Sequence, residues 1–229
     1  MKTIFFAVAT LTAALSLPAQ DTAGKKASAA AHQKVEASVT TIAAWPVDGC
    51  IVSGRALAEG KTKTFKVEGR TYKTCCGRCQ KKVEGDPAKY AAILDKAIIA
   101  SQAANYPLDT CALTKRKLND KARDVVVNET LVRVCCGRCA KKAPSKAAEL
   151  AAMVTAAAHK AQAAKYPLDS CPVSGEDLGE DPAEVMHGGT LLRFCCGDCV
   201  DAFKKAPAKP LAKLAKAAAD AAKGSSTGK

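Results

Sequence analysis

Hydrophobic and polar residues alternate in short stretches along the chain, and each stretch predicts a β-strand. The first strands read TFKVE at residues 64–68 and DVVVN at residues 124–128. A second strand follows as RTYKT, LVRV or LLRF. The residues between the two strands are Glu68-Gly69, Asn128-Glu129 and Gly188-Gly189, which are typical of tight hairpin turns. The pattern therefore predicts three β-hairpins.

Alanine-rich stretches follow the hairpins and predict helices. In the first copy Asp86-Pro87 is a good helix start, and the helical pattern runs to about Asn105. Residues 27–44 also predict a helix, whereas the final GSSTGK at residues 224–229 predicts a disordered tail. This mixture of hairpins and helices indicates the α+β class.

All twelve cysteines belong to one pattern that occurs three times. Each copy opens with an aromatic-Pro-x-Asp-x-Cys phrase, and Cys50, Cys111 and Cys171 are spaced 61 and 60 residues apart. The sets are Cys50/Cys75/Cys76/Cys79, Cys111/Cys135/Cys136/Cys139 and Cys171/Cys195/Cys196/Cys199. We expect one module per set, made of a cysteine knuckle, a hairpin and a helix. The expected modules span residues 45–105, 106–165 and 166–223.

The first residues, MKTIFFAVATLTAALSLPAQ, look like a secretory signal peptide. Lys2 precedes an apolar run, and Leu17-Pro18-Ala19 offers a small-residue cleavage site. We expect a signal peptide over residues 1–19 and an N-terminal helical segment over residues 20–44. The apolar run is too short for a membrane anchor, and no transmembrane segment is expected elsewhere. The expected location is the periplasm or the outside of the cell.

Composition and charge narrow the function. Much of the 48% hydrophobic content is alanine and only 4% is aromatic, so each small module needs disulfides or a metal ion to support its core. A formal charge of +13 would suggest nucleic acid in a cytosolic chain, but the expected export argues against that partner. We interpret the dispersed lysines as solvated helix faces, which could also attract an anionic cell-surface polymer or a protein partner.

The four cysteines of each set allow two interpretations. The Cys76-Gly77-Arg78-Cys79 spacing lets two thiolates bind one metal ion, and a hairpin would bring Cys50 to the same place. The alternative is two disulfides per module, because exported thiols tend to be oxidised. The pairings are Cys50–Cys75 with Cys76–Cys79, or Cys50–Cys76 with Cys75–Cys79. The residues alone leave both interpretations open.

Strand geometry favours one of the two adjacent cysteines. Neighbours in a strand point to opposite faces, so Cys136 would share an apolar face with Val132 and Val134. This pattern predicts the first, third and fourth cysteines as ligands. Positive residues such as Arg138 near the last cysteine favour the thiolate form, whereas the third copy has Asp198 there and should behave differently.

Redox catalysis and histidine ligation are disfavoured. A thioredoxin-like C-x-x-C site needs a surrounding βαβ pattern, which is absent from this sequence. His32, His159 and His187 do not recur at one repeat position, so they are not a shared ligand or catalytic set. We interpret His32 and His159 as solvated helix residues and His187 as a turn residue that could assist a metal site. We expect no enzymatic activity.

The third copy also resembles a known family. The run YPLDSCPVSGEDL…TLLRFCCGDCVDAFKKAP carries a Pro-Val-x-Gly phrase, a hairpin leading to Phe194-Cys195, then Cys199, Phe203 and a proline-led helix. In these features it resembles YHS and TRASH-type domains, small cysteine modules associated with heavy-metal binding. The resemblance implies metal binding through the first, second and fourth cysteines of each set. All twelve cysteines are therefore candidate ligands.

The sequence as a whole predicts an exported metal-binding protein of three treble-clef-like α+β modules with an N-terminal helix. Sulfur ligands predict a soft or borderline ion, Zn(II), Cu(I) or another heavy metal, up to one per repeat. Sequestration, trafficking and a structural role are all compatible with such sites. The alternative function is a disulfide-stapled secreted repeat protein whose basic surface binds a partner or an anionic polymer.

Overall fold

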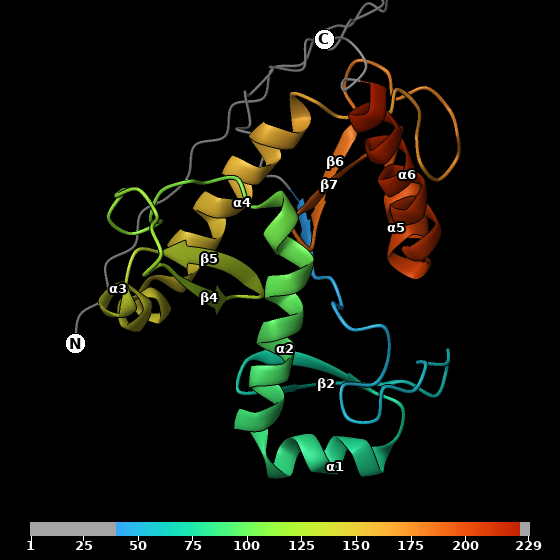
Figure 1. The fold of residues 1–229 in the computed structure, drawn as a ribbon. Helices are drawn as coiled ribbons and strands as arrows, with labels where there is room; N and C mark the ends of the chain where they lie inside the picture. Colours follow the sequence, from blue (N-terminus) through green and yellow to red (C-terminus); the bar gives the residue numbers. More distant parts are fainter. Residues whose placement is uncertain (1–39, 225–229) are drawn as a thin grey trace, which may run out of the picture. The chain divides into compact units, whose positions relative to one another are not determined.

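The computed structural model describes residues 40–224 and contains helices and small sheets, which confirms the α+β class. Three antiparallel hairpins form where the alternating pattern predicts them, and each is followed by a short helix and then a longer one (Figure 1). The strands are β1 (Thr40–Ile42), β2 (Lys63–Val67), β3 (Arg70–Thr74), β4 (Arg123–Val127), β5 (Thr130–Val134), β6 (Ala183–His187) and β7 (Thr190–Phe194). The helices are α1 (Gly77–Gly85), α2 (Pro87–Gln102), α3 (Gly137–Lys142), α4 (Ala147–Ala163), α5 (Gly197–Lys205) and α6 (Ala208–Gly224), with 3-10 turns at Ala103–Asn105 and Ala143–Lys146.

The hairpin turns are tight because both central residues have left-handed backbone angles. In the turn between β4 and β5, Asn128 and Glu129 have φ values of 46° and 59°, and Gly188 and Gly189 have 56° and 80° between β6 and β7. Positive φ at both positions gives a two-residue turn whose twist matches that of the paired strands. The predicted turn residues are therefore confirmed as the hairpin turns.

One face of each hairpin forms the core of its own repeat. In the second repeat, Val132 and Val134 of β5 are fully buried and pack with Cys111 and Cys139. The third repeat has the same arrangement, in which Phe194 of β7 is fully buried in a cluster that contains Cys171 and Cys199. The first and fourth cysteines of the second and third repeats are therefore part of the apolar cores.

The other face of the second and third hairpins contacts the long helix of the preceding repeat. Met186 and Leu191 pack with Ala158 of α4, and Val126 packs against the cluster that contains Ile98 of α2. Because both faces of β4 are covered, its sequence RDVVV ends in a continuous apolar run instead of a strict alternation.

The first hairpin has a more polar second face. Lys66 pairs with Thr71 and lies where the third hairpin pairs Met186 with Leu191. Within residues 40–224 no helix precedes this hairpin, so its second face has no helix of a preceding repeat to contact, and polar side chains suit it.

The expectation of a helix over residues 27–44 is wrong at residues 40–42. Thr40–Ile42 forms β1, which pairs in parallel with β6. The β-branched sequence TTI suits a strand, and the free side of β6 provides hydrogen-bond partners. The expected signal peptide, the rest of the expected N-terminal helix and most of the expected tail lie outside the described residues. Within residues 40–224, no helix combines the length and apolar character needed to cross a membrane.

Candidate metal centres

The first cysteine of each repeat lies in a tight backbone turn. The N–H of Cys111 donates to the carbonyl of Arg116 at 2.6 Å, and the N–H of Lys115 donates to the carbonyl of Cys111 at 2.8 Å. The N–H of Ala112 then donates to the carbonyl of Arg133 in β5 at 3.1 Å, which fixes the turn beside the hairpin. The first and third repeats contain the same two turn bonds. The knuckle predicted at the first cysteine is therefore present.

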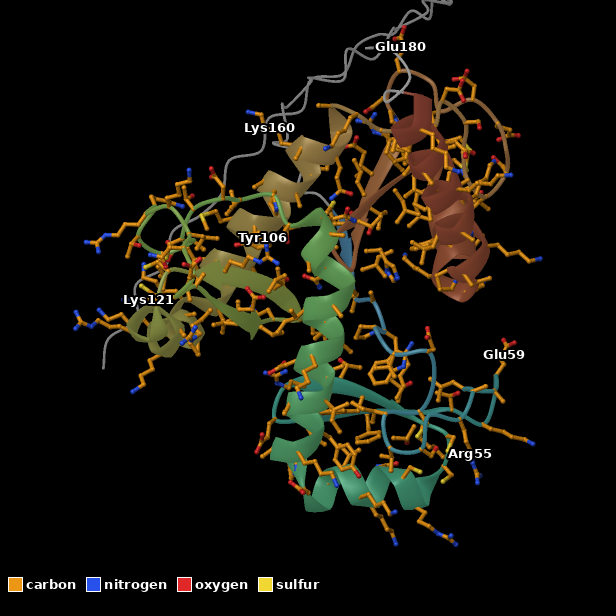
Figure 2. All side chains as sticks on the ribbon, in the orientation of Figure 1. Arg55, Glu59, Tyr106, Lys121, Lys160 and Glu180 are labelled. Carbon is orange, nitrogen blue, oxygen red and sulfur yellow. The ribbon has the colours of Figure 1, made fainter. Side chains whose placement is uncertain are left out.

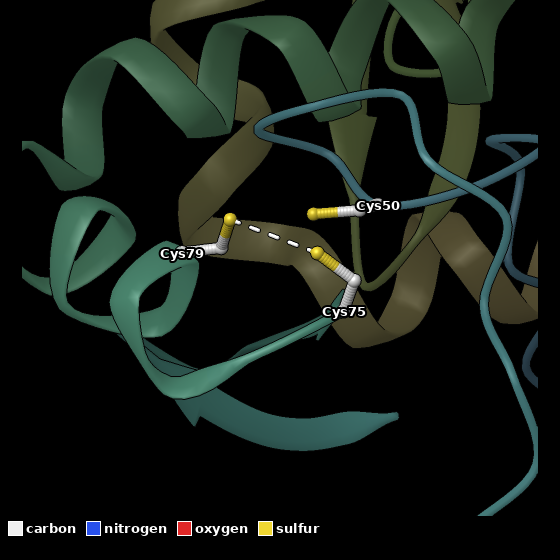
Figure 3. Close-up of side chains that lie close together, drawn as sticks. All are labelled: Cys50, Cys75 and Cys79. Atoms are coloured by element: carbon white, nitrogen blue, oxygen red, sulfur yellow. Dashed lines mark hydrogen bonds between the residues drawn. The ribbon is translucent and has the colours of Figure 1, made fainter. Parts of the chain in front are cut away.

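The other three cysteines lie where the chain passes from a strand to a helix. In the first repeat β3 ends one residue before Cys75, and Cys76 is extended, with φ −165° and ψ 166°, directly before α1. Cys79 lies in the first turn of α1. This change of direction ends the alternation of the strand, so the sulfurs of Cys75 and Cys79 both lie close to that of Cys50 (Figure 3).

In each repeat the first, second and fourth sulfur atoms lie within 4.8 Å of one another. We call these three atoms a cysteine group; the groups are Cys50/Cys75/Cys79, Cys111/Cys135/Cys139 and Cys171/Cys195/Cys199. The second and fourth sulfurs are 3.8, 3.7 and 3.7 Å apart in the three repeats. The first and fourth cysteines are buried, the second is half-buried, and all twelve cysteines are free thiols in the structure. Each group is able to hold a metal ion.

The third cysteine of each set lies beside its group. Its sulfur is 3.9, 3.9 and 3.8 Å from the second sulfur in the three repeats. Cys76 and Cys196 are exposed, and Cys136 is half-buried. The strand ends before the adjacent pair, so strand alternation does not decide which sulfur joins the group. The grouped set is the one that the family resemblance implies.

The thiols of each group have very different pKa values. Burial raises the pKa of Cys50, but hydrogen bonds with the side chain of Ser53 and with the backbone of Cys75, Ser53 and Val52 outweigh it and lower the pKa to about 6. Burial raises the pKa of Cys79 to about 12, and hydrogen bonds with the other sulfurs act in the same direction. The pKa values of Cys111 and Cys171 are also about 6, and those of Cys139 and Cys199 about 12. Each group thus pairs a readily ionised thiol with one that keeps its proton. The thiolate expected at the last cysteine is therefore wrong, because burial outweighs the nearby positive charge, and the third repeat does not differ from the others.

A hydroxyl residue three positions after the first cysteine contacts the second cysteine. The oxygen–sulfur distances are 3.5 Å for Ser53–Cys75, 3.6 Å for Thr114–Cys135 and 3.4 Å for Ser174–Cys195. These hydroxyls were not among the predicted site residues. Their recurrence in the phrases VSG, LTK and VSG was the available signal.

The histidines within residues 40–224 are not part of the cysteine groups. His159 of α4 is half-buried and its Nε2 lies 2.5 Å from Glu184 Oε2, so its interpretation as a solvated residue is wrong. His187 ends β6 directly before the turn, and its ring meets that of Phe203 edge-on at 5.0 Å. Burial lowers the pKa of His187. His32 lies outside the described residues.

Comparisons with known proteins give no match to a family model, a curated protein or a solved structure. The fold and the site nevertheless define a class: an α+β repeat protein with three cysteine groups, each able to hold a metal ion. The resemblance to YHS and TRASH-type domains rests on the residue motifs alone.

Proposed function

We propose that this chain is an exported protein that binds thiophilic metal ions, one in each repeat, and sequesters or delivers them. The observation that carries the proposal is the threefold recurrence of three sulfurs within 4.8 Å of one another. The motif resemblance to heavy-metal modules supports the class of ligand. The signal-like leader supports export to the periplasm or beyond.

The spacing of the sulfurs suits an ion at the centre of each group. For a Zn–S bond of about 2.3 Å, two sulfurs of a tetrahedral site lie about 3.8 Å apart. The second and fourth sulfurs are separated by 3.8, 3.7 and 3.7 Å, and the adjacent pairs by 3.9, 3.9 and 3.8 Å. Three sulfurs are enough for a three-coordinate Cu(I) ion, whereas Zn(II) takes a fourth ligand, for which the adjacent cysteine is well placed.

The exposure of the third cysteine supports ion exchange over a purely structural site. Structural zinc sites are closed, with all four ligands committed to the fold. Here Cys76 and Cys196 are exposed beside their groups. An exposed thiol next to a buried group can bind an arriving or departing ion first. We therefore propose sequestration or trafficking, carried out by binding and without a catalytic step.

Intact mass measurement combined with elemental analysis tests this function. The protein would be purified from an oxidising compartment and measured with and without thiol alkylation. We expect three bound ions per chain, one for each cysteine group, and twelve alkylatable thiols after chelation. A metal-free chain whose twelve cysteines have all lost their hydrogens would show disulfides and overturn the proposal.

A further inference from the structure

The three cysteine groups have the same arrangement of sulfur atoms but differ in the charged residue beside them. The fifth residue after the first cysteine is Arg55, Arg116 and Glu176 in the three repeats. The carbonyl of each accepts a hydrogen bond from the N–H of its own first cysteine, at 2.8, 2.6 and 2.7 Å. The three side chains therefore start from equivalent positions in the knuckle, but the two arginines are positive and Glu176 is negative (Figure 2 shows Arg55).

Glu176 contacts one sulfur of the cysteine group of its own repeat. Its Oε2 accepts a hydrogen bond from the thiol of Cys195 at 3.4 Å. The hydroxyl of Ser174 lies 3.4 Å from the same sulfur and accepts a hydrogen bond from the N–H of Glu176 at 3.3 Å. One short turn of backbone thus positions a carboxylate against the second sulfur of the third group.

A carboxylate and a thiolate this close repel each other unless a proton or a cation lies between them. In the metal-free protein the thiol proton of Cys195 takes that place. When Zn–S is about 2.3 Å and Zn–O about 2.0 Å, a sulfur and an oxygen on one tetrahedral zinc ion lie about 3.5 Å apart. The observed separation of 3.4 Å between Cys195 Sγ and Glu176 Oε2 therefore fits two ligands of one cation. Glu176 does not lie within 4.8 Å of all three sulfurs in this structure, so ligation requires its exposed side chain to turn further toward the group.

Resting on the proposed metal-binding function, we propose that the third group is a mixed sulfur–oxygen site in which Glu176 supplies the fourth ligand to a divalent cation of the Zn(II) class. A guanidinium has no lone pair for a cation, so Arg55 and Arg116 leave their sites with sulfur ligands alone. Sulfur-only sites favour a softer ion such as Cu(I), whereas carboxylate oxygen favours a harder one. The third repeat should therefore prefer Zn(II) more strongly than the first two, which can take Cu(I) on three sulfurs or Zn(II) with the adjacent cysteine.

Glu176→Gln in the full chain tests the mixed site, because the amide keeps the shape of the side chain and removes its charge. Competition of Zn(II) with a chelator should show one site weakened about ten- to one-hundredfold, while Cu(I) affinities change less than about threefold. Arg116→Gln is the matched control and should leave every Zn(II) affinity within about threefold. Arg116→Glu should strengthen Zn(II) binding at one further site. A circular dichroism spectrum confirms that each variant is folded.

Cys196→Ser tests the competing fourth ligand, since its sulfur lies 3.8 Å from that of Cys195. The mixed site is wrong if Cys196→Ser causes the Zn(II) loss, or if Glu176→Gln binds Zn(II) as the wild-type chain does. In both cases the general metal-binding function stands. If the wild-type chain binds neither ion, the general function itself fails. X-ray absorption of the chain loaded with one zinc should show three sulfurs and one oxygen, and four sulfurs would overturn the assignment.

Discussion

Gln102, the last residue of α2, accepts a hydrogen bond at its Oε1 from the backbone N–H of Leu131 at 2.8 Å. Its Nε2 donates to the carbonyl of Glu129 at 2.9 Å, so one side chain satisfies two backbone groups at the edge of the next hairpin. Gln162 makes the equivalent two bonds to the third hairpin, at 2.8 and 2.9 Å. Successive repeats are thus joined by directional hydrogen bonds as well as by apolar packing.

Replacing Gln102 by Leu should destabilise the chain by about 1–3 kcal/mol, because the buried N–H of Leu131 loses its partner. Leucine has a helix propensity similar to that of glutamine, so α2 itself is little affected. Urea denaturation of the intact chain measures the change. Lys96→Leu, at an exposed position of the same helix, is the matched control and should stay within about 0.5 kcal/mol of wild type. Equal losses in the two variants would assign the effect to the helix and not to the hydrogen bonds.

The hairpins and the membership of each cysteine set were predictable because they depend on local features. Alternation in TFKVE, turn residues such as Asn128-Glu129 and the spacing of the cysteines are all visible within a few dozen residues. The choice between Cys75 and Cys76 was not predictable by alternation, because it depends on where β3 gives way to α1. Strand β1 was missed for a similar reason: its partner β6 is far away in the sequence and supplies the bonds that local propensity cannot show.

His187 should make the third repeat sensitive to mild acid. It lies where the other repeats have Val67 and Val127, and its buried Nδ1 has no hydrogen-bond partner among the described residues. Burial lowers its pKa from the usual 6.5, so protonation favours the unfolded chain. Above about pH 6.5 His187 is neutral in both the folded and the unfolded chain, so the folded chain has its full stability. This stability is lost as the pH falls toward the lower pKa that His187 has in the folded chain.

His187→Val should remove this loss and stabilise the chain by about 1 kcal/mol near pH 5, with a smaller gain at pH 8. Urea denaturation at the two pH values measures the difference. An unchanged pH dependence in the variant would show that another group controls the acid sensitivity.

Replacing Cys135 and replacing Cys136 should affect metal binding differently. The sulfur of Cys135 belongs to the second cysteine group, whereas that of Cys136 lies beside it. Cys135→Ser should therefore reduce bound Cu(I) from three ions to two, as measured by elemental analysis. Cys136→Ser should retain all three ions. It should also slow transfer of the second ion to a competing thiol by about tenfold, because the thiol beside the group is gone. Loss of the ion in Cys136→Ser with retention in Cys135→Ser would support the ligand set derived from strand alternation.

Metal affinity should rise with pH, and the pKa values of Cys50 and Cys79 should determine how steeply it rises. At pH 7 Cys50, with a pKa of about 6, is mostly a thiolate, whereas Cys79, with a pKa of about 12, keeps its proton. A bound ion must displace the proton of Cys79, so affinity increases with pH throughout this range. Below pH 6 Cys50 is protonated as well, and the ion then competes with one more proton. Chelator competition measured from pH 5 to 8 should therefore show a steeper loss of affinity below about pH 6 than above it.

Ser53→Ala tests whether the contact between the Ser53 hydroxyl and Cys50 controls this pH profile at the first site. The Ser53 hydroxyl lowers the pKa of Cys50, so its removal raises that pKa and moves the steep phase of the first site to higher pH. Two of the three ions should keep their wild-type profile, because Thr114 and Ser174 serve the other groups. Ser145→Ala is the control, since that hydroxyl donates to the carbonyl of Lys142 and to no cysteine. If both variants shift the profile, or neither does, the hydroxyl beside the first cysteine does not control its ionisation. In that case the backbone hydrogen bonds of the knuckle must hold the thiolate by themselves.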